Sequence, residues 1–451
     1  MLEATSPQAW IGALVRFERE LAAAEADVGL ISAADAAAIT EAATRLRVDA
    51  TELAEDARAT GNPVVPLVRA IRDDDDLPVH FGATSQDAMD SAAMLVSAGA
   101  CRVLVADLEA AADACARLAE DHRATIMTAR TLLQPALPTT FGLQAAGWLG
   151  SLDDARAAVL RASGRLPAQL GGAAGTLAAF GDRGLDLAAA LAARLGLAEP
   201  VLPWHTDRSC LVELGAALAM ASNAAAKVAL DVVLLSQAEV GELSEGGATG
   251  HGGSSAMPHK QNAVTSVTVL AAARRAHAAY GALVSSGVQD LERAATGGWH
   301  AEWPSLTDLW RAAGGCAHGV AIVLEGLSVH ADRMQDNVQR SAGAIVTERV
   351  ALDLGKDLGR AASASLVARA SRTALDERRE LADVLSSVPE ISARRSRDEL
   401  EALCDPAGYL GASADLVARA LERHAAMRAV GTPRRDARRA GAAAMSPPPR
   451  P

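Results

Sequence analysis

Four short polar segments interrupt a chain that otherwise consists of long alanine- and leucine-rich stretches. They cover residues 80–91 (HFGATSQDAMDS), 129–142 (ARTLLQPALPTTFG), 203–208 (PWHTDR) and 250–264 (GHGGSSAMPHKQNAV). Each brings side chains that donate hydrogen bonds and at least one cationic or titratable group, which suits an anionic substrate held through many contacts. Any one of them alone is explained as well by a helix cap, a turn or a linker, so the prediction depends on their joint occurrence.

Other chemistries find little support. The glycine-rich stretch at 171–184 lacks the G-K-[ST] ending of a P-loop. The sequence contains no H-E-x-x-H metal spacing and no G-x-S-x-G nucleophile elbow. The run Asp73–Asp76 is interpreted as a solvated loop, because consecutive aspartates point in different directions. We therefore predict acid–base chemistry that uses no metal and no cofactor.

Composition indicates a helical protein of the cytoplasm. Of the 451 residues 50% are hydrophobic but only 3% aromatic, so the core must consist of Ala, Leu and Val, as is typical of closely packed helices. The net charge of −12 argues against a nucleic-acid partner. The five cysteines are widely spaced, which favours reduced thiols, and the N-terminus does not resemble a secretion signal. No uninterrupted apolar run reaches the roughly 18 residues of a membrane span, so we expect no membrane partner.

Apolar residues at three- and four-residue steps predict the long helices. We expect them over about 90–121 with Asp90 as N-cap, 139–162, from Thr206 or Asp207 to 235, 263–284, and after Pro304. The heptad-like seams are longer than one small bundle can cover, which predicts association between subunits. The predicted organisation is an N-terminal helical domain (1–90), a central helix bundle (91–344), a C-terminal helical domain (345–431) and a disordered tail (432–451).

The segment GSSAMPHKQN (253–262) resembles the G-S-S-x-M-P-x-K-x-N signature of the fumarase/aspartase superfamily. The other polar segments follow in that superfamily's order, so the resemblance covers about residues 8–430. It implies an all-α homotetramer with a central long-helix bundle, whose active sites each draw on three subunits. It also implies reactions that make or break a bond β to a carboxylate through an aci-carboxylate intermediate.

Within the superfamily, the segments at 80–91, 129–142, 170–178, 202–208 and 297–306 look most like those of bacterial 3-carboxy-cis,cis-muconate cycloisomerases. These enzymes form 4-carboxymuconolactone in protocatechuate breakdown. Fumarase, argininosuccinate lyase and adenylosuccinate lyase instead carry a T-H-x-Q segment with a catalytic histidine, at the position of Leu132 here. An amine or hydroxide leaving group benefits from such an acid, whereas a carboxylate, with a conjugate acid of pKa about 4, needs little protonation.

Three alternatives to cycloisomerisation stay open at this point. They are adenylosuccinate lyase, a lyase that expels nitrite from nitrosuccinate, and a catalytically inactive helical scaffold. Leu132 disfavours the first and suits the second, and an intact signature disfavours the third.

The resemblance also implies roles for individual residues. Ser254 corresponds to the general base, with Ser255 as the second candidate, and Lys260 with Asn262 corresponds to the groups that stabilise the aci-carboxylate. His80 is a further catalytic candidate, for proton relay or substrate binding. His300 and Glu302 belong to the segment 297–306 and Arg293 lies just before it, and we expect these three residues to line the site. The complete set of predicted substrate-binding residues is Thr84, Ser85, Gln86, Arg130, Thr131, Gln134, His205, Arg208, Ser255, Met257, Asn262 and Arg293.

Overall fold

The computed structural model describes residues 1–72, 76–246, 252–253, 257, 260–293 and 295–431. The predicted base Ser254, its alternative Ser255 and the tail 432–451 lie outside these residues. The chain divides into two compact units, each described by itself: Met1–Ala114 with Asp154–Val329, and Cys115–Asp153 with His330–Pro451. The predicted C-terminal domain, 345–431, falls within the second unit, and the predicted domain limits at 90 and 344 stay predictions.

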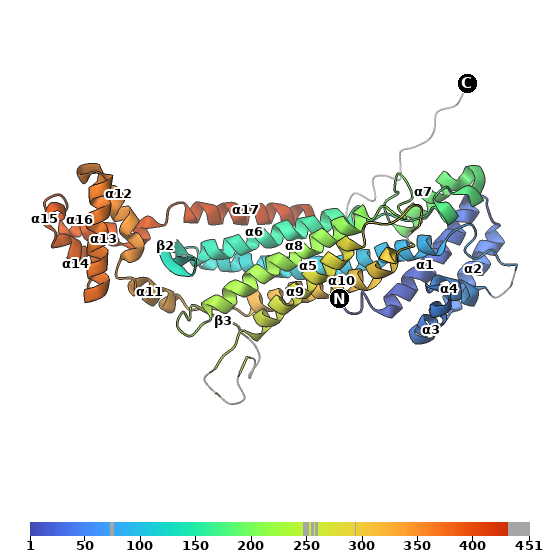
Figure 1. The fold of residues 1–451 in the computed structure, drawn as a ribbon, viewed down its shortest axis with the longest axis horizontal. Helices are drawn as coiled ribbons and strands as arrows, with labels where there is room; N and C mark the ends of the chain where they lie inside the picture. The colour runs from blue at the N-terminus through green and yellow to red at the C-terminus, as the bar shows by residue number, and fades with distance from the viewer. Residues whose placement is uncertain (73–75, 247–251, 254–256, 258–259, 294, 432–451) are drawn as a thin grey trace, which may run out of the picture. The chain divides into compact units, whose positions relative to one another are not determined.

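The first unit is helical, as predicted (Figure 1). Two long helices, α5 (Ser85–Asp121) and α6 (Phe141–Ser163), pass through both units. The first unit also contains α1 (Pro7–Asp27), α2 (Ala33–Arg45), α3 (Ala50–Thr60), α4 (Val64–Ile71), η1 (Gly172–Ala174), η2 (Ala178–Arg183), α7 (Gly184–Leu195), α8 (Ser209–Leu235), α9 (Val264–Ser285) and α10 (Gly298–Glu325). A short antiparallel pair joins β3 (Leu243–Ser244) to β4 (Ser328–Val329).

The second unit combines one hairpin with short helices. Strands β1 (Ile126–Thr131) and β2 (Gln134–Thr140) are antiparallel. The helices are α11 (Ala331–Gln339), η3 (Ala344–Val346), α12 (Thr347–Leu358), α13 (Arg360–Glu377), α14 (Leu381–Ser386), α15 (Pro389–Ser392), α16 (Arg397–Cys404), η4 (Pro406–Tyr409) and α17 (Ser413–Gly431).

Helices α8, α9 and α10 pack against one another and carry the predicted apolar seams. Leu214, Leu218 and Val228 of α8 are fully buried, so the seam faces the bundle interior. Gly215 permits close approach of α9, because a Cβ there would lie 2.8 Å from Tyr280 Cδ2. Both α5 and α8 are long and apolar enough to cross a membrane by length and composition, but 56% of the most apolar window of each is buried in the fold, as in helices that pack within a bundle.

Two predicted helix starts were wrong. Helix α5 begins at Ser85, where the Asp87 carboxylate accepts the Thr84 N–H, and Asp90 lies inside the helix with 2% exposure. Helix α10 begins at Gly298 and contains Pro304. Its first turns bury Trp299 and Glu302, and this tertiary packing outweighs the hydrogen bond that a proline removes. The other long helices begin and end within about three residues of the expected positions.

Candidate active site

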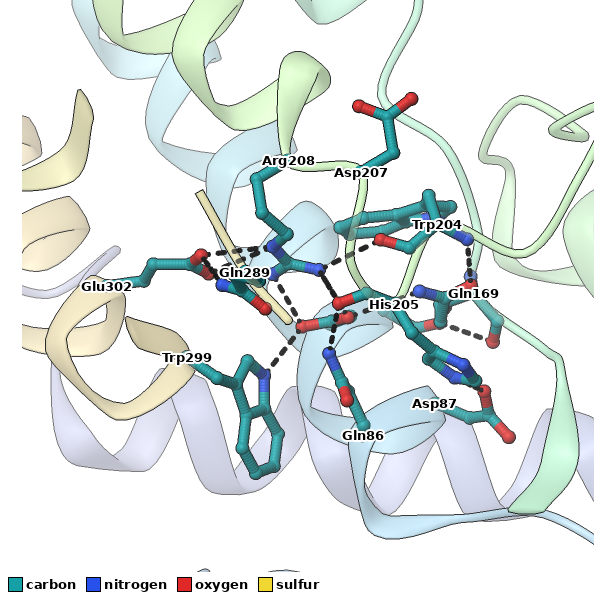
Figure 2. A network of polar contacts seen from close by, with 12 residues as sticks. Gln86, Asp87, Gln169, Trp204, His205, Asp207, Arg208, Gln289, Trp299 and Glu302 are labelled. Carbon is teal, nitrogen blue, oxygen red and sulfur yellow. Dashed lines mark hydrogen bonds and ion pairs between the residues drawn. The ribbon is translucent and has the colours of Figure 1, made fainter. Parts of the chain in front are cut away.

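An ion-pair network centred on Arg208 joins three helices of the first unit (Figure 2). Arg208 immediately precedes α8, Asp90 belongs to α5 and Glu302 to α10. The guanidinium binds Asp90 through Nη1–Oδ2 (2.8 Å) and Nη2–Oδ1 (2.9 Å), and binds Glu302 through Nη2–Oε2 (2.7 Å) and Nε–Oε1 (3.0 Å). The Arg208 Cζ also lies 4.7 Å from the centroid of the Trp204 ring. At most 3% of each of the three ionic residues is exposed, so solvent screens the network little.

The network contains two carboxyl groups, those of Asp90 and Glu302, but only one guanidinium, that of Arg208. Burial raises the pKa of Glu302 to about 7, although its ion pair with Arg208 opposes this shift. Burial also lowers the pKa of Arg208, but the two carboxylates raise it by more, so the guanidinium stays charged. Glu302 accepts a further hydrogen bond from Gln289 Nε2, and Asp90 accepts one from Trp299 Nε1 at 3.0 Å. These neutral donors partly compensate the second negative charge.

A second polar cluster lies beside this network, around Asp87. His205 Nε2 lies 2.7 Å from Asp87 Oδ1, and both side chains are buried. The Asp87 carboxylate also accepts the backbone N–H groups of Thr84, Gly171 and Gly172. A Cβ at Gly171 would lie 2.7 Å from the His205 ring, so this turn needs glycine. Asp87 therefore ties the 80–91 segment to the 171–172 turn and to the 203–208 segment.

Three predicted substrate-binding residues have protein partners in this network. Gln86 is 1% exposed and donates its Nε2–H to the His205 carbonyl at 2.7 Å. His205 and Arg208 are 4% and 3% exposed, and their side chains bind the carboxylates described above. The contacts that these residues make are positioning contacts, and direct binding of substrate stays a prediction for them.

Other predicted residues lie at the edge of the network. Thr84 and Ser85 are half-buried at the start of α5. Arg293 donates from Nη2 to the carbonyls of Gly172 and Ala173, both at 3.0 Å, so it packs on the turn that Asp87 holds. His80 Nδ1 lies 2.7 Å from Glu18 Oε1. The structure thus brings the 80–91 segment, the 203–208 segment and Arg293 together.

The predicted carboxylate-binding residues Arg130, Thr131 and Gln134 lie on the hairpin of the second unit. Thr131 pairs with Gln134 at the end of the ladder, and Arg130 Nη1 donates to the Thr128 carbonyl. Leu132 and Leu133 form the turn, with φ of 50° and 65° and exposures of 97% and 66%. Left-handed backbone conformations are unfavourable for leucine, and such strain is concentrated at functional loops. The hairpin thus presents Leu132 outward.

The described part of the signature segment lies at the far end of α8 from Arg208. Lys260 and Met257 are exposed there, and Asn262 closes the turn through hydrogen bonds to the Gly252 carbonyl, 2.8 Å from Nδ2 and 2.9 Å from N. The chain that leads to this segment is attached to the end of α8, because the Glu242 N–H donates a hydrogen bond to the carbonyl of Leu235, the last residue of that helix. Because α8 has 27 residues, the segment is separated from Arg208 by about 40 Å along this helix. One chain therefore does not bring Lys260 together with Thr84 or His80.

Reasoning from sequence missed five polar residues of the first unit. They are Glu18, Asp87, Asp90, Gln169 and Gln289. Gln169 links the two clusters, because its Oε1 accepts the Trp204 N–H at 3.0 Å and its Nε2 donates to Asp90 at 3.2 Å. A usable signal was present for the two aspartates, since Ala88 and Met89 separate them and apolar residues follow from Ala92, and a charge on an apolar helix needs a partner.

Comparison with known proteins agrees with this architecture. The family described as "Lyase" matches residues 3–277, and the one described as "Adenylosuccinate lyase C-terminus" matches residues 343–420. Nitrosuccinate lyase of Streptomyces davaonensis is 44% identical, over 93% of this chain and 91% of its own. The 3-carboxy-cis,cis-muconate cycloisomerase of Pseudomonas aeruginosa is 42% identical, over 92% of both chains.

Solved structures point the same way. The crystal structure of 3-carboxy-cis,cis-muconate lactonizing enzyme from Pseudomonas putida matches with a TM-score of 0.87 and 36% identity, over 94% of this chain and 97% of the other. A fumarate lyase from Mesorhizobium sp. BNC1 matches with a TM-score of 0.86 and 34% identity, over 93% and 96%. The polar segments, the long-helix bundle and these matches agree that the chain belongs to the fumarase/aspartase superfamily of lyases.

Proposed function

We propose that the protein is a cycloisomerase that converts 3-carboxy-cis,cis-muconate to 4-carboxymuconolactone by acid–base catalysis through an aci-carboxylate. The proposal is supported by relatives that carry this name and are 35–42% identical over about nine-tenths of the chain. The observation that carries the choice of chemistry is Leu132 on the outward turn of the β1–β2 hairpin.

Leu132 restricts the leaving group. A leucine side chain can neither donate nor accept a proton, so this hairpin offers no acid where relatives with T-H-x-Q have one. A leaving carboxylate is stable as an anion because its conjugate acid has a pKa of about 4. An amine or hydroxide leaves far less readily without a proton donor. The reaction therefore belongs to the class in which the leaving group departs as a stable anion and needs no protonation by a general acid.

A second candidate has its own support. Nitrosuccinate lyase is 44% identical over 93% of the chain, and nitrite is likewise a stable anion. Elimination of nitrite from nitrosuccinate is therefore the alternative reaction. Adenylosuccinate is disfavoured, because its leaving group is an amine.

The proposed roles follow the signature. Ser254 exchanges the proton α to the carboxylate, with Ser255 as the alternative, and Lys260 and Asn262 stabilise the charge of the aci-carboxylate. Thr84, Ser85, Thr131 and Gln134 bind the other carboxylates of the substrate. Lys260 and Asn262 are separated from Thr84 and Ser85 by about 40 Å along α8 within one chain, which supports a homotetramer in which several subunits supply each site. We place this enzyme in the cytoplasm.

The test is turnover of three substrates by the purified full-length chain. We expect the enzyme to consume 3-carboxy-cis,cis-muconate, seen as a loss of its ultraviolet absorbance. This turnover should need no added cofactor and should continue when a metal chelator is present. Nitrite release from nitrosuccinate, with no loss of muconate absorbance, would establish the second candidate instead. Turnover of adenylosuccinate alone would overturn the argument from Leu132, and turnover of none of the three would overturn the proposed function.

A further inference from the structure

Two buried acids on α1 have no evident structural reason to be there. Glu18 and Glu25 are 1% and 0% exposed and lie seven residues apart, so they share one face of the helix. That face packs into a cluster built from apolar side chains such as Phe17 and Leu21. Among the residues that the structure describes, Glu18 Oε2 and both Glu25 oxygens have no hydrogen-bond partner. A buried carboxylate without partners destabilises a fold, so a functional reason must be sought.

The remaining oxygen of this pair binds His80. Glu18 Oε1 lies 2.7 Å from His80 Nδ1, and the side chains are 0% and 15% exposed. His80 has a φ of 62°, a left-handed conformation that is uncommon for residues other than glycine. It opens the segment whose Thr84 and Ser85 are proposed to bind a carboxylate. Glu18 thus holds a strained residue at the entrance to that segment.

We propose that Glu18 is a positioning residue that keeps His80 as an imidazolium and leaves its Nε2–H to bind a substrate carboxylate. With Nδ1 bound to Glu18, Nε2 is the only ring nitrogen left for a ligand. The inference rests on the proposed function, because it makes His80 part of the site that binds a polycarboxylate.

The charges around the ring agree with this role. Burial lowers the pKa of His80, but Glu18 of α1 and Asp87 of α5 raise it by more, against Arg72 after α4, so the net shift is upward. Burial raises the pKa of Glu25 to about 8, with a further contribution from the Glu18 charge. Near neutral pH Glu25 is therefore mostly protonated. Of the two acids, Glu18 is the one that contacts His80.

The first test needs no substrate. Diethylpyrocarbonate modifies neutral imidazole, so the pH dependence of its reaction at His80, followed by peptide mass spectrometry, reports the His80 pKa. We expect Glu18→Gln to lower that pKa by about 1 unit or more, because the carboxylate that stabilises the cation is lost. Glu25→Gln is the matched control, since it changes a buried acid of the same helix that is already neutral. An unchanged His80 titration in Glu18→Gln, or an equal shift in Glu25→Gln, overturns the inference.

The second test uses turnover of whichever substrate is accepted. We expect Glu18→Gln to raise KM about tenfold at pH 8 but much less at pH 6, with kcat within about threefold, because substrate binding depends on the charge of His80. Glu25→Gln keeps the wild-type KM at pH 7. A loss in kcat with an unchanged KM contradicts the proposed role.

A double-mutant cycle separates this role from a defect in folding. If Glu18 acts through His80, adding Glu18→Gln to His80→Asn raises KM no further than His80→Asn alone. Additive effects of the two substitutions contradict the inference. If the His80 titration shifts as expected but no substrate is turned over, the proposed function fails while the Glu18–His80 relationship stands.

Discussion

Arg208 and Asp90 lie 118 positions apart in the sequence and form a buried ion pair with two parallel contacts, 2.8 and 2.9 Å long. The same guanidinium binds Glu302 of α10. A single side chain therefore fixes the junction of α5, α8 and α10, the helices from which the 80–91 and 203–208 segments extend. The site depends on this junction even though none of the three groups needs to touch substrate.

Arg208→Ala is expected to destabilise the fold by about 3–5 kcal/mol, because it leaves two buried carboxylates without their cation. The midpoint of urea unfolding, followed by circular dichroism, measures this loss. Arg165→Ala is the matched control: the Arg165–Glu213 pair is exposed, 74% and 50%, and its removal should cost less than about 1 kcal/mol. Equal effects of the two substitutions would show that the buried network contributes no more than a surface pair.

Ser254→Ala is expected to reduce kcat on the accepted substrate by about 10²–10⁴, because a general base is lost. Ser255→Ala, the neighbouring control, should reduce kcat much less. Steady-state kinetics of the two variants distinguish the serines. The reverse order of effects would transfer the role of base to Ser255, and full activity of both variants would exclude a serine base.

Leu132→Ala is expected to leave kcat/KM within about threefold of wild type, because the side chain supplies no proton. Stability should change by less than about 0.5 kcal/mol, since the leucine is 97% exposed. Gln134→Ala, in the same hairpin, provides the contrast: loss of a carboxylate contact should raise KM about tenfold. A hundredfold fall in kcat for Leu132→Ala would contradict the view that this position needs no catalytic group.

Glu25→Gln is expected to stabilise the fold at alkaline pH. The native-state pKa of Glu25 is raised from 4.5 to about 8, so its favourable contribution is complete below about pH 4.5 and is lost as the pH rises through 8. Wild type and Glu25→Gln should therefore have similar stability at pH 5, and the variant should be more stable at pH 9 by a few kcal/mol, as follows from the raised pKa of Glu25. Thermal melts at both pH values check this, and a difference that is independent of pH would contradict it.

The helices and the family could be predicted because both depend on local patterns. Apolar residues at three- and four-residue steps record which face of a helix is buried, so the all-α class and the extents of α6 and α9 followed from the sequence alone. The signature at 253–262 is contiguous, and Leu132 can be recognised by its place in a short segment. Each of these features lies within one short, contiguous stretch of the sequence, so it can be recognised without knowing the tertiary structure.

Only the tertiary structure decided what the polar residues bind. Aspartate is a residue type typical of helix N-caps, yet Asp90 lies inside α5. Its buried charge is tolerated there because Arg208, 118 positions later in the sequence, forms an ion pair with it. Glu18 gives no sign in the sequence of its contact with His80, 62 residues away. Whether a buried charge is tolerable depends on the partner that folding brings to it, and that partner is determined by helix packing and not by neighbours in the chain.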